Sequence, residues 1–208
     1  MVRAAILVSG GGTNLQAIID AKMAGKIPSA ELSLVIASNS KAYALTRAAE
    51  AGIPSVVCGK KKAETIDEYG ERLLNVLREN RIDVAVLAGF LTILPENVIR
   101  AYDHRIINIH PSLIPSFCGE GFYGLRVHEA ALAKGVKVTG ATVHFVNEIA
   151  DGGPIIMQQP VAVERGDTPQ TLQRRIMEQA EWKILPRVVQ LFCDEKIEVI
   201  DGKAYILD

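Results

Sequence analysis

The feature that most constrains the fold is an alternation in the first part of the chain, where each short β-rich run is followed by a helical pattern. Runs of apolar and β-branched residues predict buried strands, and apolar residues three and four apart predict helices packed on a sheet. We expect strands at 4–9, 32–38, 55–57, 84–87 and 105–110, and helices at 15–24, 42–51, 66–80, 95–102 and 127–134. Such units join parallel strands, so the pattern predicts an α/β fold with an open, mostly parallel twisted sheet and helices on both faces.

After Gly135 the rhythm changes. Extended runs at 138–146 and 154–163 flank the turn-rich "NEIADGG", which predicts a hairpin or a crossover in place of another helix. Thr168 and Pro169 suit the start of a long helix that runs to about 191, and Pro186 predicts a kink in it. The final "IEVIDGKAYI" predicts an Asp-Gly hairpin. The C-terminal part should therefore add antiparallel elements to the parallel sheet.

Length and composition favour one domain that acts on small molecules. The 208 residues, 49% of them hydrophobic, predict a single domain at 1–208, with an N-terminal half to about 104 and a C-terminal half from about 105. A net charge of -1 shows no basic surplus for nucleic acid or a membrane surface. The short apolar run at the start and the lack of any apolar stretch of about 18 residues predict neither a signal peptide nor a membrane span.

Cysteine usage points to a reducing compartment. The three cysteines are Cys58, Cys118 and Cys193, an odd number that lies far apart without C-x-x-C spacing. Neither a disulfide framework nor a thiolate metal site is indicated, and we expect a cytoplasmic chain. His110, His128 and His144 also lack the spacing of a zinc motif, so no metal site is predicted.

The stretch "IINIHPSLIP", residues 106–115, sets two polar side chains in an apolar strand. Side chains alternate along a strand, so Asn108 and His110 share a face, and Pro111 keeps His110 extended. Burying an amide or an imidazole costs about 1–3 kcal/mol if its hydrogen bonds go unmade. Because open α/β sheets bind ligands at the carboxyl ends of strands, the pair is a candidate site. The alternative is a hydrogen-bonded strand end that only holds the next loop.

The stretch "SGGGTNLQ", residues 9–16, joins the first strand to the first helix. Its glycines let backbone N–H groups approach a ligand, Thr13 or Asn14 can cap the helix, and the helix N-terminus favours an anion. A phosphate fits this chemistry. The spacing matches neither a P-loop nor a complete dinucleotide motif, and the alternative is a tight turn.

Other polar residues carry weaker signals. "DGGP" at 151–154 is by itself a turn, but Asp151 placed beside His110 would raise the imidazole pKa and improve it as a proton donor. His144 alternates with apolar residues and is expected to be a core histidine. Glu181 lies inside the long final helix, where most glutamates are exposed.

Taken in order, five segments resemble the folate-dependent formyltransferase family, in particular the phosphoribosylglycinamide formyltransferases. They are "SGGGTNLQAIID", "VLAGFLTILP", "NIHPSLIPSF", "GATVHFV" and "DGGPII", and they cover nearly the whole chain. The resemblance implies a Rossmann-like fold and transfer of a formyl group from 10-formyltetrahydrofolate to the amine of glycinamide ribonucleotide in purine biosynthesis. It implies a monomer or homodimer with no metal and no tightly bound cofactor, the folate being a co-substrate.

The resemblance also implies roles for individual residues. The catalytic residues would be Asn108, His110 and Asp151, with Asn108 and a protonated His110 donating to the oxyanion and Asp151 assisting proton transfer. The ribonucleotide would be held by Gly12, Thr13, Asn14 and Glu181. The folate would be held by Leu91, Thr92, Ile93, Leu94, Asn108, Asn147, Ile149 and Asp151.

Two departures and three alternatives accompany this hypothesis. Thr92 stands where such enzymes often carry an arginine, and the loop at 117–125 is a few residues longer than usual, so its path is open. Methionyl-tRNA formyltransferase and formyltetrahydrofolate hydrolase share the chemistry but usually carry a further domain, for which we expect no room in 208 residues. A non-catalytic sensor of a phosphorylated metabolite or a folate would not need the complete set of three catalytic residues.

Overall fold

The computed structural model describes residues 1–207, which divide into two compact units. The first unit is Met1–Asn108, and the second begins at Ile109. The boundary falls inside one strand, β5 (Ile106–His110), which starts in the first unit and ends in the second. Among the described residues, no helix combines the length and the apolar character needed to cross a membrane.

The first unit is the alternating α/β structure that the sequence predicts. Its elements are β1 (Val2–Val8), α1 (Thr13–Met23), β2 (Ala30–Ala37), α2 (Ala44–Glu50), β3 (Ser55–Val57), α3 (Ile66–Glu79), β4 (Val84–Leu87), α4 (Glu96–Ala101) and the start of β5. The strands pair in parallel in the order β3-β2-β1-β4-β5. Central strand β1 is buried from Ala4 to Val8, as expected of a strand covered on both faces. The expectation of a mostly parallel sheet is confirmed.

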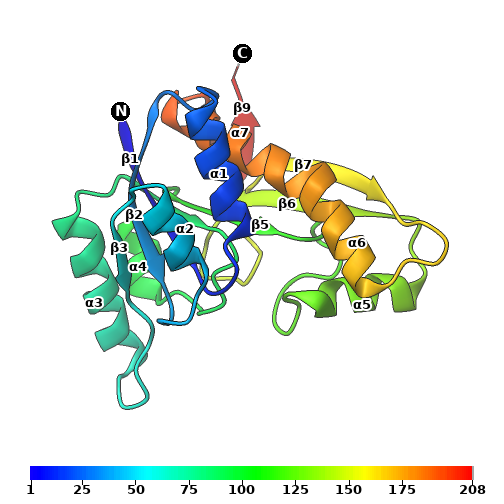
Figure 1. Ribbon diagram of the computed structural model, residues 1–208, viewed down its shortest axis with the longest axis horizontal. Helices are drawn as coiled ribbons and strands as arrows, with labels where there is room; N and C mark the ends of the chain where they lie inside the picture. Colours follow the sequence, from blue (N-terminus) through cyan, green and yellow to red (C-terminus); the bar gives the residue numbers. More distant parts are fainter. Residues whose placement is uncertain (208) are drawn as a thin grey trace. The chain divides into compact units, whose positions relative to one another are not determined.

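The strand order explains why helices cover both faces. From β1 the chain moves outward to β2 and β3, then returns to β4 and β5 on the other side of β1. Because such crossovers are right-handed, α1 and α2 lie on one face, while α3 and α4 lie on the other. This arrangement is visible in Figure 1. Reversal of direction beside β1 makes the carboxyl end of that strand the expected ligand-binding edge.

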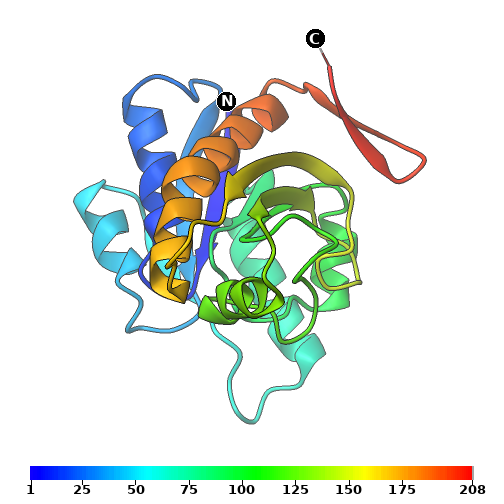
Figure 2. The same ribbon diagram turned by 90° about the vertical axis from the view of Figure 1, so that its right-hand side faces the viewer.

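The second unit carries the antiparallel additions. Strands β6 (Val138–Phe145) and β7 (Ile155–Ala162) pair as a hairpin, so of the two predicted alternatives the hairpin is correct. Helix α5 (Leu125–Lys134) precedes the hairpin, and α6 (Pro169–Ile176), a π-helical segment (Met177–Glu181) and α7 (Trp182–Cys193) follow it. The closing strands β8 (Ile197–Ile200) and β9 (Lys203–Ile206) form the predicted Asp-Gly hairpin, which projects beyond the end of α7 (Figure 2).

The predicted long helix contains an irregularity that the sequence did not indicate. The break in the long helix is the π-helical segment Met177–Glu181, and Pro186 lies inside α7. A proline clashes with the carbonyl four residues earlier, which here belongs to Trp182, the first residue after the π turn. The π-helical segment thus ends directly before the residue whose carbonyl faces the proline ring, and α7 extends through Pro186.

Candidate functional site

His110 ends β5 in the second unit, where its imidazole is buried and only 5% exposed. Its Nε2 lies 2.9 Å from the carbonyl oxygen of Phe117. Since a carbonyl only accepts hydrogen bonds, Nε2 carries a hydrogen and donates it. The other nitrogen, Nδ1, lies 3.5 Å from Oδ2 of Asp151. The carboxylate expected near His110 is therefore beside it, and half-buried Asn108 lies two residues earlier on the same face of β5.

The loop between β6 and β7 fixes Asp151. Its backbone is left-handed, with φ of 54°, a conformation that Asp and Asn adopt more readily than most residues. Oδ1 of the Asn147 side chain accepts from Ile149 N–H, and Nδ2 donates to Gly152 O. Gly153 leaves no room for a side chain, because a Cβ there would lie 1.9 Å from the carbonyl oxygen of Phe145. "DGGP" is thus a turn whose geometry also aims a carboxylate.

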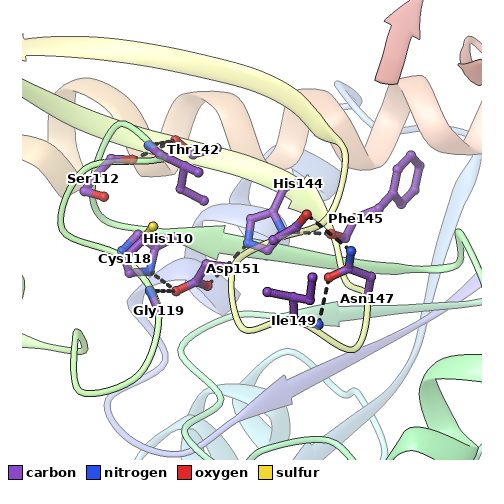
Figure 3. A network of polar contacts seen from close by, with 12 residues as sticks. His110, Ser112, Cys118, Gly119, Thr142, His144, Phe145, Asn147, Ile149 and Asp151 are labelled. Carbon is purple, nitrogen blue, oxygen red and sulfur yellow. Dashed lines mark hydrogen bonds and ion pairs between the residues drawn. The ribbon is translucent and has the colours of Figure 1, made fainter. Parts of the chain in front are cut away.

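A second histidine flanks the carboxylate. Nε2 of His144 lies 3.5 Å from Oδ1 of Asp151, and its Nδ1 lies 2.7 Å from the carbonyl oxygen of Phe145. His110 and His144 are thus arranged alike, each with one nitrogen on a backbone carbonyl and the other on the same carboxylate (Figure 3). His144 is buried, as expected, but the expectation of an ordinary core histidine missed this contact.

The electrostatics correct one expectation. Burial lowers the pKa of His110 and outweighs the charge of Asp151 and the Phe117 carbonyl, both of which act to raise it. The net pKa of His110 is therefore lowered, not raised as the sequence argument held. Burial acts to raise the pKa of Asp151, but the His144 side chain, the charge of His110 and the N–H of Gly119 together lower it. Gly119 donates to Oδ2 of Asp151 at 2.8 Å.

A third histidine, His128 on α5, is also buried, and its ring nitrogens have no partner among the described residues. Burial and then the charge of His110 lower the pKa of His128 to about 4. It is therefore a neutral side chain in the folded protein near neutral pH. The sequence carried no signal for this residue beyond its type.

In the first unit, the loop from Ser9 to Gly12 follows β1 at the carboxyl edge of the sheet. Helix α1 has Gly12 at its N-cap, with φ of 70°, and among residues 1–207 no side chain caps it. The expected capping by Thr13 or Asn14 is wrong, because the helix starts directly after Gly12. A Cβ on Gly12 would lie 2.7 Å from the Cβ of Ala44, so only glycine fits. Backbone N–H groups in the first turn of a helix point toward its N-terminus, the direction from which an anion approaches.

Three carbonyls of this loop are held from the α2 side. Nδ2 of Asn39 donates to Ser9 O at 2.9 Å, Ala44 N–H donates to Gly10 O at 3.1 Å, and Nε of Arg47 donates to Gly11 O at 2.8 Å. Within a trans peptide the C=O and the following N–H point in opposite directions. The N–H groups of residues 10–12 therefore point away from α2, and such an arrangement suits an anion.

Apart from Asn108 in β5, the residues expected to bind folate occupy two loops, one in each unit. In the first unit, Leu91 and Ile93 are exposed, Thr92 is half-buried and Leu94 is buried. Leu91 N–H donates to the hydroxyl of Ser9, so this loop lies against the loop from Ser9 to Gly12. In the second unit, Asn147 and exposed Ile149 share the loop of Asp151.

Glu181 is buried and only 5% exposed at the end of the π-helical segment, unlike most helical glutamates. A π turn inside a helix is often found at a functional site, and this irregularity carried no clear sequence signal. Among residues 1–207 no group of three or more His, Cys, Asp or Glu side chains could hold a metal ion.

Comparison with known proteins gives consistent matches. The formyl transferase family model matches residues 2–189. The phosphoribosylglycinamide formyltransferase of Haemophilus influenzae is 37% identical over 99% of this chain and 94% of its own length. The chloroplastic phosphoribosylglycinamide formyltransferase of Arabidopsis thaliana is 37% identical over 93% of this chain. The chain spans 66% of that relative, just under two thirds of its length.

The fold is shared with a solved structure as well. Glycinamide ribonucleotide transformylase 1 from Symbiobacterium toebii aligns with a TM-score of 0.93 and 38% identity. The alignment covers 100% of this chain and 95% of the other. Both the sequence and the fold are therefore those of proteins that carry formyl transfer in their names.

Proposed function

This chain belongs to the formyl transferase family, and we propose that it transfers the formyl group of 10-formyltetrahydrofolate to the amine of glycinamide ribonucleotide in purine biosynthesis. The observation that carries the proposal is the carboxylate of Asp151 between the imidazoles of His110 and His144, with an oxygen 3.5 Å from each ring. Such a group can take up and return a proton inside a buried environment.

In the proposed reaction the amine attacks the formyl carbon, and the C–N bond to the folate nitrogen N10 breaks. The tetrahedral intermediate between these events carries a negative oxygen. Asn108 and His110 donate hydrogen bonds to that oxygen, in a low-dielectric setting where such donors act more strongly than in water. Asp151 helps to pass the amine proton to the departing nitrogen.

The lowered pKa of His110 fits this sequence of events. In the resting enzyme the ring is uncharged above about pH 6.5, its ordinary pKa. A developing oxyanion adds a negative charge to the one on Asp151, and both favour the imidazolium. Nδ1 of His110 takes up the proton that the attacking amine loses, and the ring returns it to N10 as the C–N bond breaks. The ring is therefore charged, and Nδ1–H can donate to the oxygen, only while the intermediate exists, and Asp151 compensates that charge. The expectation from the sequence, that Asp151 holds the ring protonated, is replaced by this proposal.

Both substrates are proposed to bind through residues of the loops in the first and second units. The N–H groups of Gly12, Thr13 and Asn14 receive the ribonucleotide phosphate, and Glu181 contacts the glycinamide group. The loop Leu91–Leu94 and the residues Asn147 and Ile149 contact the folate. The exposed side chains of Leu91 and Ile93 suit the face of a flat ring, whereas buried Leu94 can offer only backbone groups.

We further propose that the protein acts in the cytoplasm, where Cys58, Cys118 and Cys193, which form no disulfide among the described residues, remain reduced. Its partners are small molecules, and 10-formyltetrahydrofolate is a co-substrate. A monomeric or homodimeric state stays a prediction.

One assay tests the reaction. Purified protein is mixed with 10-formyltetrahydrofolate, and loss of the formyl group is followed spectroscopically with and without glycinamide ribonucleotide. We expect turnover only when the amine is present. Release of formate without the amine would instead identify a hydrolase, and formylation of methionyl-tRNA but not of the ribonucleotide would identify a tRNA formyltransferase. Binding of either ligand without turnover would identify a sensor.

A further inference from the structure

The long loop at 117–125 gained no role from the sequence, yet its first residues contact both members of the candidate catalytic pair. The carbonyl oxygen of Phe117 accepts from Nε2 of His110, and the N–H of Gly119 donates to Asp151. In Figure 3 Gly119 lies directly beside Asp151. The backbone of this loop therefore fixes which nitrogen of His110 carries the hydrogen and which side of Asp151 faces the ring.

Phe117 makes its contact from an unfavourable backbone conformation. Its φ is 51°, in the left-handed region that a bulky residue rarely adopts unless its surroundings hold it. If the residue relaxed to a negative φ, its peptide planes would turn and the carbonyl would leave Nε2 of His110. Something in the loop must stabilise the observed conformation.

The side chain that packs against Phe117 is Phe122, the other phenylalanine of the loop. The rings of Phe117 and Phe122 pack edge to face, with centroids 6.4 Å apart and planes at 61°. Phe122 N–H donates to Gly119 O at 3.1 Å, which closes a turn and brings the second ring back onto the first. On the other side of Phe117, the hydroxyl of Ser112 donates a hydrogen bond to the carbonyl oxygen of Ser116.

We propose that Phe122 is a positioning residue, which holds Phe117 in its left-handed conformation and thereby keeps the Phe117 carbonyl on Nε2 of His110. The hydrogen of the neutral ring is then confined to Nε2, and Nδ1, the nitrogen beside Asp151, is the one that exchanges a proton. This inference rests on the proposed function for its kinetic consequence, but not for its structural one.

Several titratable groups lie around His110 and contribute to the pH dependence of this site. Asp151 and His144 face it from the β6–β7 hairpin, His128 from α5, and Cys118 lies in the loop itself, where burial and then Asp151 raise the pKa of its thiol. None of these groups belongs to the Phe117–Phe122 contact. Replacing Phe122 therefore leaves the charges around His110 in place and changes only the support of the Phe117 carbonyl.

The experiment compares Phe122→Ala with Phe122→Tyr, which keeps a ring edge, and with Tyr123→Ala, which removes an exposed neighbouring ring that contacts Arg126. The ¹⁵N shifts of the His110 ring report its tautomer. We expect the Nε2–H form in the unsubstituted protein, in Phe122→Tyr and in Tyr123→Ala, and a mixture in Phe122→Ala. The kcat of Phe122→Ala should fall roughly 10- to 100-fold, with the KM of each substrate within about twofold.

The pH profile gives a second measurement. The Phe117 carbonyl acts to raise the pKa of His110, so its loss lowers that pKa. The acid limb, on which activity falls as the resting His110 ring takes up a proton, should move to lower pH in Phe122→Ala. Adding Phe117→Gly to Phe122→Ala should restore part of the kcat, because glycine adopts a positive φ without support.

An unchanged tautomer and an unchanged kcat in folded Phe122→Ala would overturn the proposal. If that variant does not fold, Phe122→Leu, which keeps apolar volume without a ring edge, takes its place and is judged by the same two readouts. Failure of the proposed function is recognised separately, since the unsubstituted protein would then lack amine-dependent turnover while the tautomer measurement still decides the role of Phe122.

Discussion

In the loop at 9–12 of the first unit, peptide N–H groups face the proposed ligand, and the side chains of Asn39 and Arg47 hold the carbonyls on the opposite side. In the second unit the roles of backbone and side chains are reversed. There the side chains of His110 and Asp151 face the proposed chemistry, and peptide groups of Phe117 and Gly119 hold them. A phosphate needs several fixed donors, which a backbone supplies, whereas proton transfer needs groups that titrate, which only side chains supply.

The difference predicts which kinds of substitution each region tolerates. In the first region residues 10–12 are glycines and offer only their backbone, so we expect backbone conformation to decide binding there. In the second, the identity of two or three side chains decides activity, and the backbone acts through them. Four predictions test this contrast.

The largest effect is expected for Asp151→Asn. Asparagine has nearly the same shape and also adopts the left-handed conformation, so the loop should keep its path while the charge is lost. We expect kcat to fall roughly 10²–10³-fold, with ligand binding largely retained, measured by steady-state kinetics and calorimetry. Asp201→Asn, in an exposed turn with φ of 51°, is the matched control and should keep full activity. Full activity in Asp151→Asn would remove the contrast between the two regions.

A backbone effect should dominate in the first region. Gly12→Ala places a Cβ 2.7 Å from Ala44 at a positive φ, so the N–H groups at the start of α1 must move. Losing one charged hydrogen bond costs about 1.5–3 kcal/mol, so the KM for the ribonucleotide should rise roughly 10- to 100-fold, with kcat less affected. Gly11→Ala has open space and should change neither constant. Equal effects of the two substitutions would show that loop conformation is not what matters.

The buried histidines of the second region should make its stability depend on pH. Because the folded-state pKa of His128 is about 4, the unfolded chain binds a proton more readily between that value and about 6.5. The stability is fully present above about pH 6.5 and is lost as the pH falls toward 4, by about 2 kcal/mol at pH 5.

Urea unfolding at pH 7 and pH 5 measures this loss. His128→Gln should remove most of the difference between the two pH values, whereas His104→Gln, at an exposed histidine, should leave it intact. If the free energy of unfolding differed between pH 7 and pH 5 as much in His128→Gln as in the unsubstituted protein, the pH dependence would belong to other groups.

The smallest effect is expected for Arg47. Its guanidinium binds Gly11 O and, through Nη1, Oε1 of Gln16 at 2.9 Å, and it stacks on Tyr43. Arg47→Met should raise the KM for the ribonucleotide roughly three- to tenfold, since a partly exposed hydrogen bond contributes about 1 kcal/mol. Arg47→Lys keeps the charge but cannot bind Gly11 and Gln16 at the same time as the guanidinium does. It should therefore raise the KM for the ribonucleotide as much as Arg47→Met does. Full affinity in the lysine variant would show that charge alone acts on the phosphate.

The sequence by itself determined the features that depend on local pattern. Alternating strands and helices predicted the parallel sheet of the first unit, because a hydrophobic period reports which face of an element is buried. The position of Asn108 and His110 at the end of β5 and the Asp-Gly hairpin followed from neighbouring residues in the same way.

Only the tertiary structure decided the rest, because those features depend on groups far apart in the chain. The contact of His144 with Asp151, the hold of Phe117 on His110 and the closeness of Ala44 to Gly12 all join different elements. The direction of the His110 pKa shift is of the same kind, since burial by the surrounding side chains outweighs the charge of Asp151 and the Phe117 carbonyl. A one-dimensional pattern records neither distance nor burial between elements, and the chemistry of this site depends on both.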